Sequence, residues 1–177
     1  DLSYLGCIPN MTIMAPSDEI ELRNMVKTAA EFDSGPIALR YPRGTGYGTE
    51  KLQSLFGYRL ENGEIPKAES IEIGKGRIVR RPGGLDGQRS ATRGMRREDR
   101  VAVLCIGTRL HEALVAANEV EDIDKTLGVT VADARFMKPL DVDLVRALAD
   151  DHSVLITIEE GSIGGFGDHV LHFLSLD

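Results

Sequence analysis

Residues 154–170 read VLITIEEGSIGGFGDHV, and this stretch decides the fold class. Five apolar or β-branched residues come first and predict a strand. The glycines that follow the two glutamates predict a turn, which opens a helix with Val170, Leu171 and Leu174 among its apolar residues. A strand, a Gly-rich turn and a helix in this order are typical of an α/β protein.

Strands and helices alternate along the rest of the chain as well. Residues 101–106, VAVLCI, form a continuous apolar run that ends at Gly107, as expected of a strand covered on both faces. Between the strands, apolar residues recur at helical spacing. We therefore predict an α/β fold with a mostly parallel sheet, whose further strands are expected at Met11–Ala15, Ile37–Tyr41, Ile71–Val79 and Val129–Ala132. The helix after the first of these strands is expected to be capped by Ser17.

The composition excludes several classes of protein. The chain has 177 residues, 42% of them hydrophobic, so it can form the core of one domain or of parts of two. Its longest apolar run is far too short to cross a bilayer, and no secretory leader opens it, so no membrane partner is expected. Two distant cysteines, Cys7 and Cys105, predict neither a disulfide framework nor a metal cluster and favour a reducing compartment.

The charge is unevenly distributed along the chain. The net charge of −7 argues against a dedicated nucleic-acid binder. Residues 80–100 nevertheless contain seven arginines against three acidic residues, a net charge of +4. This stretch is rich in glycine and lacks periodicity, so it predicts a mobile, solvated surface insertion. A patch for nucleic acid or an acidic partner is the alternative, which the lack of aromatic residues there disfavours.

An anion-binding loop is predicted after the strand at Ile37–Tyr41. Arg43 lies near its start, in the sequence PRGTGYG of residues 42–48. Ligands of open α/β sheets bind at the carboxyl ends of strands, glycines let the backbone approach an anion, and a guanidinium binds phosphate through two hydrogen bonds. A solvated arginine in an ordinary loop is the alternative. Arg40, on the strand itself, is expected to be a structural ion-pair partner.

The two glutamates after the last strand, Glu159 and Glu160, are a second candidate site. Paired carboxylates can transfer protons or hold a cation. Adjacent residues of a strand point to opposite faces, however, so these two cannot easily share one substrate. The glycines that follow could bind an anion at a helix N-terminus, but the lysine of a phosphate-binding loop is missing. A structural role is therefore favoured. His169 and His172 predict no zinc site, because a third ligand is not evident.

Several segments together resemble one enzyme family. They are residues 1–26 (DLSYLGCIPNMTIMAPSDEIELRNMV), 40–44 (RYPRG), 73–79 (IGKGRIV), 101–110 (VAVLCIGTRL) and 131–141 (VADARFMKPLD), followed by the stretch quoted first. In this order they are similar to the 1-deoxy-D-xylulose-5-phosphate synthases, thiamine-diphosphate enzymes of the transketolase superfamily. The final segment is also similar to the beta subunits of 2-oxo acid dehydrogenases, whereas RYPRG and ADARFMKPLD favour the synthases.

The resemblance implies a domain organisation and a reaction. Residues 1–48 would be the end of a pyrimidine-binding domain. Residues 49–70, which lack strong periodicity, would be a linker. Residues 71–177 would form most of a transketolase C-terminal-like domain. The family joins pyruvate, with loss of CO₂, to glyceraldehyde 3-phosphate for isoprenoid, thiamine and pyridoxal biosynthesis. By its place in the motif, Arg43 would hold the phosphate of glyceraldehyde 3-phosphate. The family also implies a homodimer.

Parts of the family pattern have no counterpart in this chain. The motif that binds Mg²⁺ and the diphosphate, the glutamate that activates the cofactor and an active-site histidine would lie upstream of Asp1. We therefore assign no catalytic, cofactor-binding or metal-binding residue and expect the chain alone to be inactive. A beta subunit of a 2-oxo acid dehydrogenase and a non-catalytic assembly module remain as alternatives. The family implies the cytoplasm in a bacterium and the plastid in a eukaryote.

Overall fold

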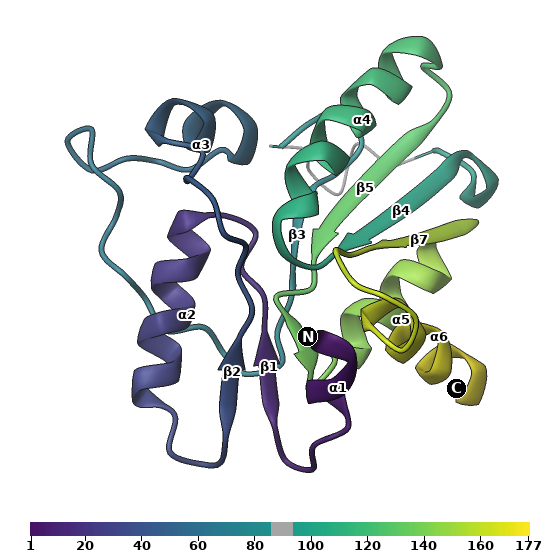
Figure 1. Ribbon diagram of the computed structural model, residues 1–177. Helices are drawn as coiled ribbons and strands as arrows, with labels where there is room; N and C mark the ends of the chain where they lie inside the picture. Colours follow the sequence, from purple (N-terminus) through teal and green to yellow (C-terminus); the bar gives the residue numbers. More distant parts are fainter. Residues whose placement is uncertain (86–93) are drawn as a thin grey trace.

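The computed structural model describes residues 1–85 and 94–177, which form two β-sheets flanked by helices (Figure 1). The strands are β1 (Thr12–Met14), β2 (Ile37–Leu39), β3 (Arg77–Arg80), β4 (Arg100–Cys105), β5 (Gly128–Asp133), β6 (Phe136–Lys138) and β7 (Val154–Ile158). The α-helices are α1 (Leu2–Gly6), α2 (Glu19–Glu31), α3 (Thr49–Phe56), α4 (Leu110–Ile123), α5 (Val142–Asp151) and α6 (Phe166–Leu176). No helix in these described ranges is both long and apolar enough to cross a bilayer.

The larger sheet has the strand order β3-β5-β4-β7 and is mostly parallel, as predicted. β4 pairs in parallel with β5 and β7, whereas β3 runs antiparallel to β5. Side chains of β4 alternate between two faces: Ala102 and Leu104 pack in the core shared with α5 and α6, and Val103 and Cys105 pack in the core shared with α4. Coverage of both faces explains why the sequence of β4 is continuously apolar.

The smaller sheet, ordered β2-β1-β6, is built from distant parts of the chain. β1 and β2 are parallel neighbours, and β6 joins them antiparallel to β1. Only two residues separate β6 from β5 of the larger sheet, so the chain passes directly from one sheet into the other. Ile13 of β1 and Leu104 of β4 also belong to one buried cluster. The two sheets therefore share a core.

The stretch predicted to be a linker without strong periodicity contains a helix, α3. Leu52 is fully buried and Phe56 is 7% exposed, and both pack in the cluster that includes residues of α4. Gly57 follows in a left-handed conformation, with φ of 71°, and ends the helix. Two buried residues in an eight-residue helix give too weak a pattern to identify from the sequence.

The cap of α2 differs from the predicted one. Asp18, and not Ser17, is the N-cap: its carboxylate accepts hydrogen bonds from the amides of Ile20 at 2.8 Å and Glu21 at 2.9 Å. The Ser17 hydroxyl instead donates to Asp133 Oδ2 at 2.9 Å. Both residues are good caps by type, and the longer-range bond to Asp133 decides between them.

The predicted basic insertion at residues 80–100 is not a solvated loop throughout. Residues 86–93 lie outside the described part of the chain. The prediction of a solvated side chain is wrong for Arg80. This residue ends β3, is 3% exposed, pairs with Glu121 and donates a hydrogen bond to the carbonyl of Val129 at 2.6 Å. Arg97 donates to the carbonyl of Asp150 at 2.9 Å, at the end of α5. Composition alone could not reveal these bonds, because the partners lie far away in the sequence.

Candidate functional site

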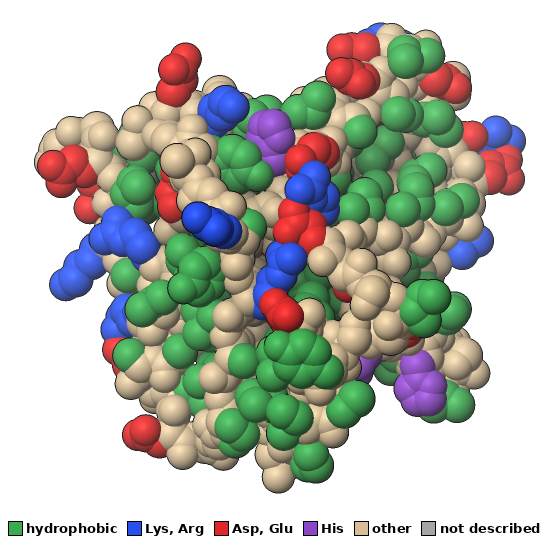
Figure 2. Space-filling view, in the orientation of Figure 1, with side chains coloured by type: hydrophobic (Ala, Val, Ile, Leu, Met, Phe, Trp, Pro, Cys, Tyr) green, Lys and Arg blue, Asp and Glu red, His purple; other side chains and the backbone are tan. Residues whose placement is uncertain are grey.

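The loop of residues 40–48, which follows β2, contacts elements of both sheets. At its start, Arg40 Nη1 lies 2.6 Å from Glu160 Oε2, just after β7. At its end, the Tyr47 hydroxyl donates to the carbonyl of Thr108 at 3.1 Å, and the Tyr47 ring stacks on His111 with 5.0 Å between centroids. Acidic and basic side chains alternate in a row on this face of the molecule (Figure 2). The loop is therefore fixed at both ends.

The glycine-rich part of the loop binds a carboxylate of the chain itself. Glu19, in the first turn of α2, accepts hydrogen bonds from the amide of Tyr47 at 3.1 Å and from that of Gly48 at 2.7 Å. A Cβ at Gly46 would lie 2.7 Å from Glu19 Oε1, so only glycine permits this approach. The anion that these backbone amides hold is thus internal, and nothing in the sequence pattern identified Glu19 as their partner.

Arg43 lies in the exposed middle of this loop. No hydrogen bond or ion pair from the described residues engages its side chain, in contrast to Arg40. A cavity of about 400 Å³ adjoins the loop and is lined by its neighbours Pro42 and Gly44 together with Arg109. The role of Arg43 as a phosphate ligand stays a prediction. The structure brings no other predicted site residue into contact with Arg43.

Glu160 connects the loop to the larger sheet. Besides Arg40, it accepts hydrogen bonds from Arg109 Nε at 2.9 Å and from the Thr108 hydroxyl at 3.0 Å. These hydrogen bonds lower the pKa of Glu160 to about 2, and the bond from Arg40 has the largest effect. The carboxylate is therefore ionised at neutral pH. The prediction that Arg40 is a structural ion-pair partner is confirmed.

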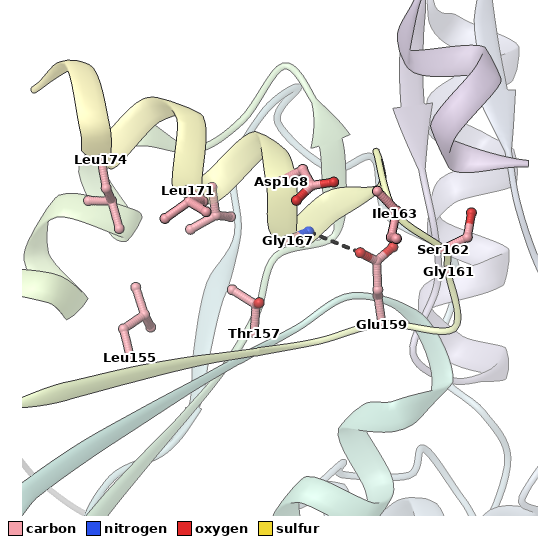
Figure 3. Close-up of a pocket in the computed structure, with 11 residues that line it drawn as sticks. Leu155, Thr157, Glu159, Gly161, Ser162, Ile163, Gly167, Asp168, Leu171 and Leu174 are labelled. Carbon is pink, nitrogen blue, oxygen red and sulfur yellow. Dashed lines mark hydrogen bonds between the residues drawn. The ribbon is translucent and has the colours of Figure 1, made fainter.

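Glu159 points to the opposite face of β7 from Glu160, as predicted. Its Oε1 accepts a hydrogen bond from the amide of Gly167 at 3.0 Å, at the start of α6 (Figure 3). A Cβ at Gly161 or Gly165 would collide with the same carboxylate. The second glycine-rich turn therefore also binds a carboxylate of its own chain, and the two glutamates do not converge on one ligand.

A buried cluster of charges, which the sequence did not predict, lies where the two sheets meet. The carboxylates of Asp18, Glu21 and Asp133 are all buried. Arg77 on β3 faces them, with Nη1 3.2 Å from Glu21 and Nε 3.6 Å from Asp133. Arg135 adds two hydrogen bonds of 2.8 Å to Glu21. Burial raises the pKa of Asp133 to about 6 and also raises that of Asp18.

The only sequence signal for this cluster is positional. Asp133 ends a buried strand, and Asp18 comes shortly after another buried strand, where a charged residue needs a partner. The partner Arg77 lies outside both segments, so the pairing depends on how the sheets pack. We assign this cluster a structural role in joining the sheets.

The described residues do not fit the diphosphate and Mg²⁺ of thiamine diphosphate. Across residues 1–85 and 94–177, no group of three or more His, Cys, Asp and Glu side chains could hold a metal ion. The amides of the two glycine-rich loops, which would be the natural diphosphate ligands, bind Glu19 and Glu159 instead. We therefore assign to the residues of this chain no catalytic step that uses the cofactor.

Comparison with known families agrees with this architecture. Residues 1–47 match the transketolase pyrimidine binding domain, and residues 91–177 match the transketolase C-terminal domain. The chain belongs to the transketolase superfamily. In this transketolase-type chain, β6 of the C-terminal domain completes the sheet that β1 and β2 of the pyrimidine-binding part begin. The superfamily and the fold class implied by the sequence are thus confirmed.

A solved structure of the same superfamily is similar over nearly the whole chain. It is described as a split gene transketolase, inactive beta4 tetramer, and it matches with a TM-score of 0.70 and 25% sequence identity. The match covers 99% of this chain and 48% of that one. The transketolase-type chain thus spans about half the length of this relative.

Proposed function

We propose that this chain is part of a 1-deoxy-D-xylulose-5-phosphate synthase, in which Arg43 binds the phosphate of glyceraldehyde 3-phosphate. The observation that carries the proposal is the RYPRG loop. Arg43 is exposed and without a partner among the described residues, while Arg40 and Glu19 hold the loop on either side of it. An exposed guanidinium on a fixed backbone suits recognition of a phosphate, because the backbone is already ordered and only the side chain must be ordered on binding.

In this proposal the chain contributes to binding the second substrate and not to holding the cofactor. Thiamine diphosphate, with Mg²⁺, supplies the chemistry that joins the two-carbon unit of pyruvate to the aldehyde carbon of glyceraldehyde 3-phosphate. Its ligands would belong to residues beyond the 177 of this chain. Glu19 and Arg40 would act as positioning residues for Arg43. The complete enzyme would be a homodimer.

A second candidate is the beta chain of a split thiamine-diphosphate enzyme, the class that includes the beta subunits of 2-oxo acid dehydrogenases. The description of the structural relative as a split gene transketolase in an inactive tetramer favours it. In such an enzyme a separate chain would supply the diphosphate site. The chain would then be inactive alone for the same physical reason as in the first proposal.

The test supplies the missing half separately. The purified chain is mixed with the complementary part of a bacterial synthase, which carries the diphosphate motif, the activating glutamate and the active-site histidine. Thiamine diphosphate, Mg²⁺, pyruvate and either glyceraldehyde 3-phosphate or lipoamide are added, and the product is followed by NMR. We expect 1-deoxy-D-xylulose 5-phosphate from the mixture and none from the chain alone. Product from the chain alone would contradict our assignment of the cofactor ligands to other residues. Transfer to lipoamide but not to glyceraldehyde 3-phosphate would favour the second candidate.

A further inference from the structure

Both ends of the loop of residues 40–48 are connected to one residue of the C-terminal domain, Thr108. At the start of the loop, the Thr108 hydroxyl donates to Glu160 Oε1 at 3.0 Å, and Glu160 Oε2 accepts a hydrogen bond from Arg40. At the end of the loop, the Tyr47 hydroxyl donates to the carbonyl of Thr108 at 3.1 Å. Thr108 follows β4 and Glu160 follows β7. The loop is therefore held against the carboxyl ends of two strands of the larger sheet.

Glu160 is the central acceptor of this contact. Arg40 Nη1 lies 2.6 Å from its Oε2, and Arg40 Nη2 also donates to its backbone carbonyl at 3.5 Å. Arg109 Nε donates to Oε1 at 2.9 Å. The side chains of Glu160 and Arg40 are only 20% and 24% exposed. A half-buried carboxylate with charged donors on both oxygens has little freedom, so Glu160 fixes the position of Arg40.

The chain between Arg40 and Arg43 has few conformations. The amide of Arg40 donates to the carbonyl of Met14 at 2.9 Å, which extends the pairing of β1 with β2. The ring of Pro42 fixes its own φ, and Tyr41 is restricted to extended backbone because it precedes a proline. A displacement of Arg40 would therefore be passed on to Arg43.

The loop is less restricted after Arg43. Gly44 and Gly46 follow, and glycine has access to a wide range of backbone conformations. Within the described part of the chain, the next loop amide that makes a hydrogen bond is that of Tyr47. Arg43 should therefore follow the position of Arg40 more closely than that of Tyr47.

We propose that Glu160 is a positioning residue for substrate binding: by holding Arg40, it places the Arg43 guanidinium for the phosphate of glyceraldehyde 3-phosphate. This role rests on the proposed function and extends it to the C-terminal domain. Glu160 itself would touch neither the phosphate nor a reacting atom. The affinity for the phosphorylated substrate would then depend on a contact between two domains.

The test compares the KM values for the two substrates in the reconstituted mixture. Glu160→Gln keeps the shape of the side chain but removes its charge. Because members of one hydrogen-bond network are energetically coupled, this variant should raise the KM for glyceraldehyde 3-phosphate about three- to tenfold. The KM for pyruvate should change less than about twofold, because pyruvate has no phosphate group to place. Thr108→Val removes only the hydroxyl donor and should have a smaller effect in the same direction.

Glu112→Gln is the matched control. Glu112 pairs with Arg109, as Glu160 does, but in the described part of the chain it makes no ion pair with the loop. Since this ion pair is exposed, the variant should change either KM less than about twofold. Far-ultraviolet circular dichroism and thermal unfolding verify that all the variants fold.

A double-mutant cycle shows whether Glu160 acts through Arg43. In the Arg43→Ala background there is no guanidinium to place, so Glu160→Gln should raise the KM for glyceraldehyde 3-phosphate by less than about 1.5-fold. A general structural effect of Glu160 would instead multiply with that of Arg43→Ala.

Nuclear magnetic relaxation of the full chain gives a second readout that needs no activity. The amide order parameters of Arg43, Gly44 and Thr45 should fall in Glu160→Gln and stay unchanged in Glu112→Gln. This measurement decides the matter if the mixture forms no product.

Three results would overturn the role of Glu160. The first is an unchanged KM for glyceraldehyde 3-phosphate in Glu160→Gln when Arg43→Ala raises it, which would leave the proposed function intact. The second is a pair of multiplicative effects in the double-mutant cycle, and the third is unchanged order parameters in Glu160→Gln. An unchanged KM in Arg43→Ala would contradict the proposed function itself, and the role of Glu160 with it.

Discussion

Glu19 Oε1 accepts a hydrogen bond of 2.7 Å from the amide of Gly48, 29 residues further along the chain. This bond joins the first turn of α2 to the end of the RYPRG loop, and a second bond from the Tyr47 amide completes the contact. The conformation of the loop therefore depends on a residue outside its own motif. The ligand binding that we propose for Arg43 and the fixation of the loop by Glu19 can be distinguished by mutation.

Replacing Glu19 should loosen the loop without unfolding the protein. For Glu19→Ala we expect the free energy of unfolding to fall by about 1–3 kcal/mol, because two amides lose a charged acceptor. Urea unfolding measures this change. Hydrogen exchange should become faster at Tyr47 and Gly48. Glu64→Ala is the control, since Glu64 is exposed and its change should stay within about 0.5 kcal/mol. Unchanged exchange at Tyr47 and Gly48 would show that Glu19 does not hold the loop.

A side chain added to the second glycine-rich turn at Gly165 should displace the Glu159 carboxylate. In Gly165→Ala the added Cβ would collide with the Glu159 carboxylate, and we expect a loss of about 1–3 kcal/mol in the free energy of unfolding. In Gly44→Ala the new Cβ meets nothing within 4 Å, so the change should be small. Urea unfolding of the two variants in parallel compares the sites. Equal stabilities would mean that the turn can move away from Glu159.

The three parallel strands of the larger sheet could be predicted from the sequence because their local composition and their tertiary environment agree. The strand expected at Ile71–Val79 is wrong in its first part, since β3 begins only at Arg77. Residues 101–106 are apolar at every position, and β4 is covered on both faces. Local composition likewise predicted the strand that ends before Glu159. The alternation of side chains along a strand predicted that Glu159 and Glu160 point in opposite directions. These features depend on residues that are adjacent in the sequence.

Other features that were missed depend on residues far apart in the sequence, in contrast to helix α3, whose local pattern is weak. Arg80 is indistinguishable from its basic neighbours until packing brings Glu121 to it. The glycine-rich loop was identified as an anion-binding segment, but its anion is Glu19 of the same chain. Local sequence thus identifies the type of group that a loop can bind, whereas only the packed structure identifies the partner.

The buried charge cluster predicts that the free energy of unfolding changes with pH in the mildly acidic range. Burial raises the pKa of Asp133 from 3.8 to about 6, so the native state binds this proton more tightly than the unfolded state. The resulting stabilisation is complete below pH 3.8 and is lost as the pH rises through about 6. We expect this group to lower the free energy of unfolding as the pH rises from about 4 to about 6, by about 1.4 kcal/mol per unit of pKa difference.

Urea unfolding across this pH range, with Asp133→Asn as the comparison, measures the contribution. Asparagine keeps the shape of the side chain but does not titrate, so the decrease in stability should be smaller in the variant. Asp18, whose pKa is also raised by burial, would account for part of the decrease that remains. An equally steep decrease in both proteins would mean that Asp133 does not bind the proton.

The Glu160 network should have the opposite pH dependence. Hydrogen bonds lower the pKa of Glu160 from 4.5 to about 2, and the bond from Arg40 has the largest effect. The ionised Glu160 therefore stabilises the fold above pH 4.5, and this stabilisation is lost as the pH falls toward 2. Glu160→Gln should lower the free energy of unfolding at neutral pH by about 1–2 kcal/mol. Glu112→Gln should cost at most about 0.5 kcal/mol, because Glu112 makes one exposed ion pair with Arg109.

Unfolding by urea at several acidic pH values tests the network further. The stabilities of Glu160→Gln and the wild type should converge as the pH approaches 2, since the wild-type carboxylate is then protonated as well. A difference that persists unchanged at that pH would show that packing, and not charge, accounts for the effect of the substitution.

The proposed role of Arg43 predicts a change in one substrate only. In the reconstituted mixture, Arg43→Ala should raise the KM for glyceraldehyde 3-phosphate at least tenfold, because a charge-assisted contact to phosphate contributes about 1.5–3 kcal/mol. The KM for pyruvate should stay the same, since pyruvate has no phosphate group. Arg43→Lys keeps the charge but loses the bidentate geometry and should lie between the wild type and the alanine variant. Steady-state kinetics with each substrate varied in turn measure both constants. Equal increases in the two KM values would indicate a general disturbance of the site and would contradict phosphate binding by Arg43.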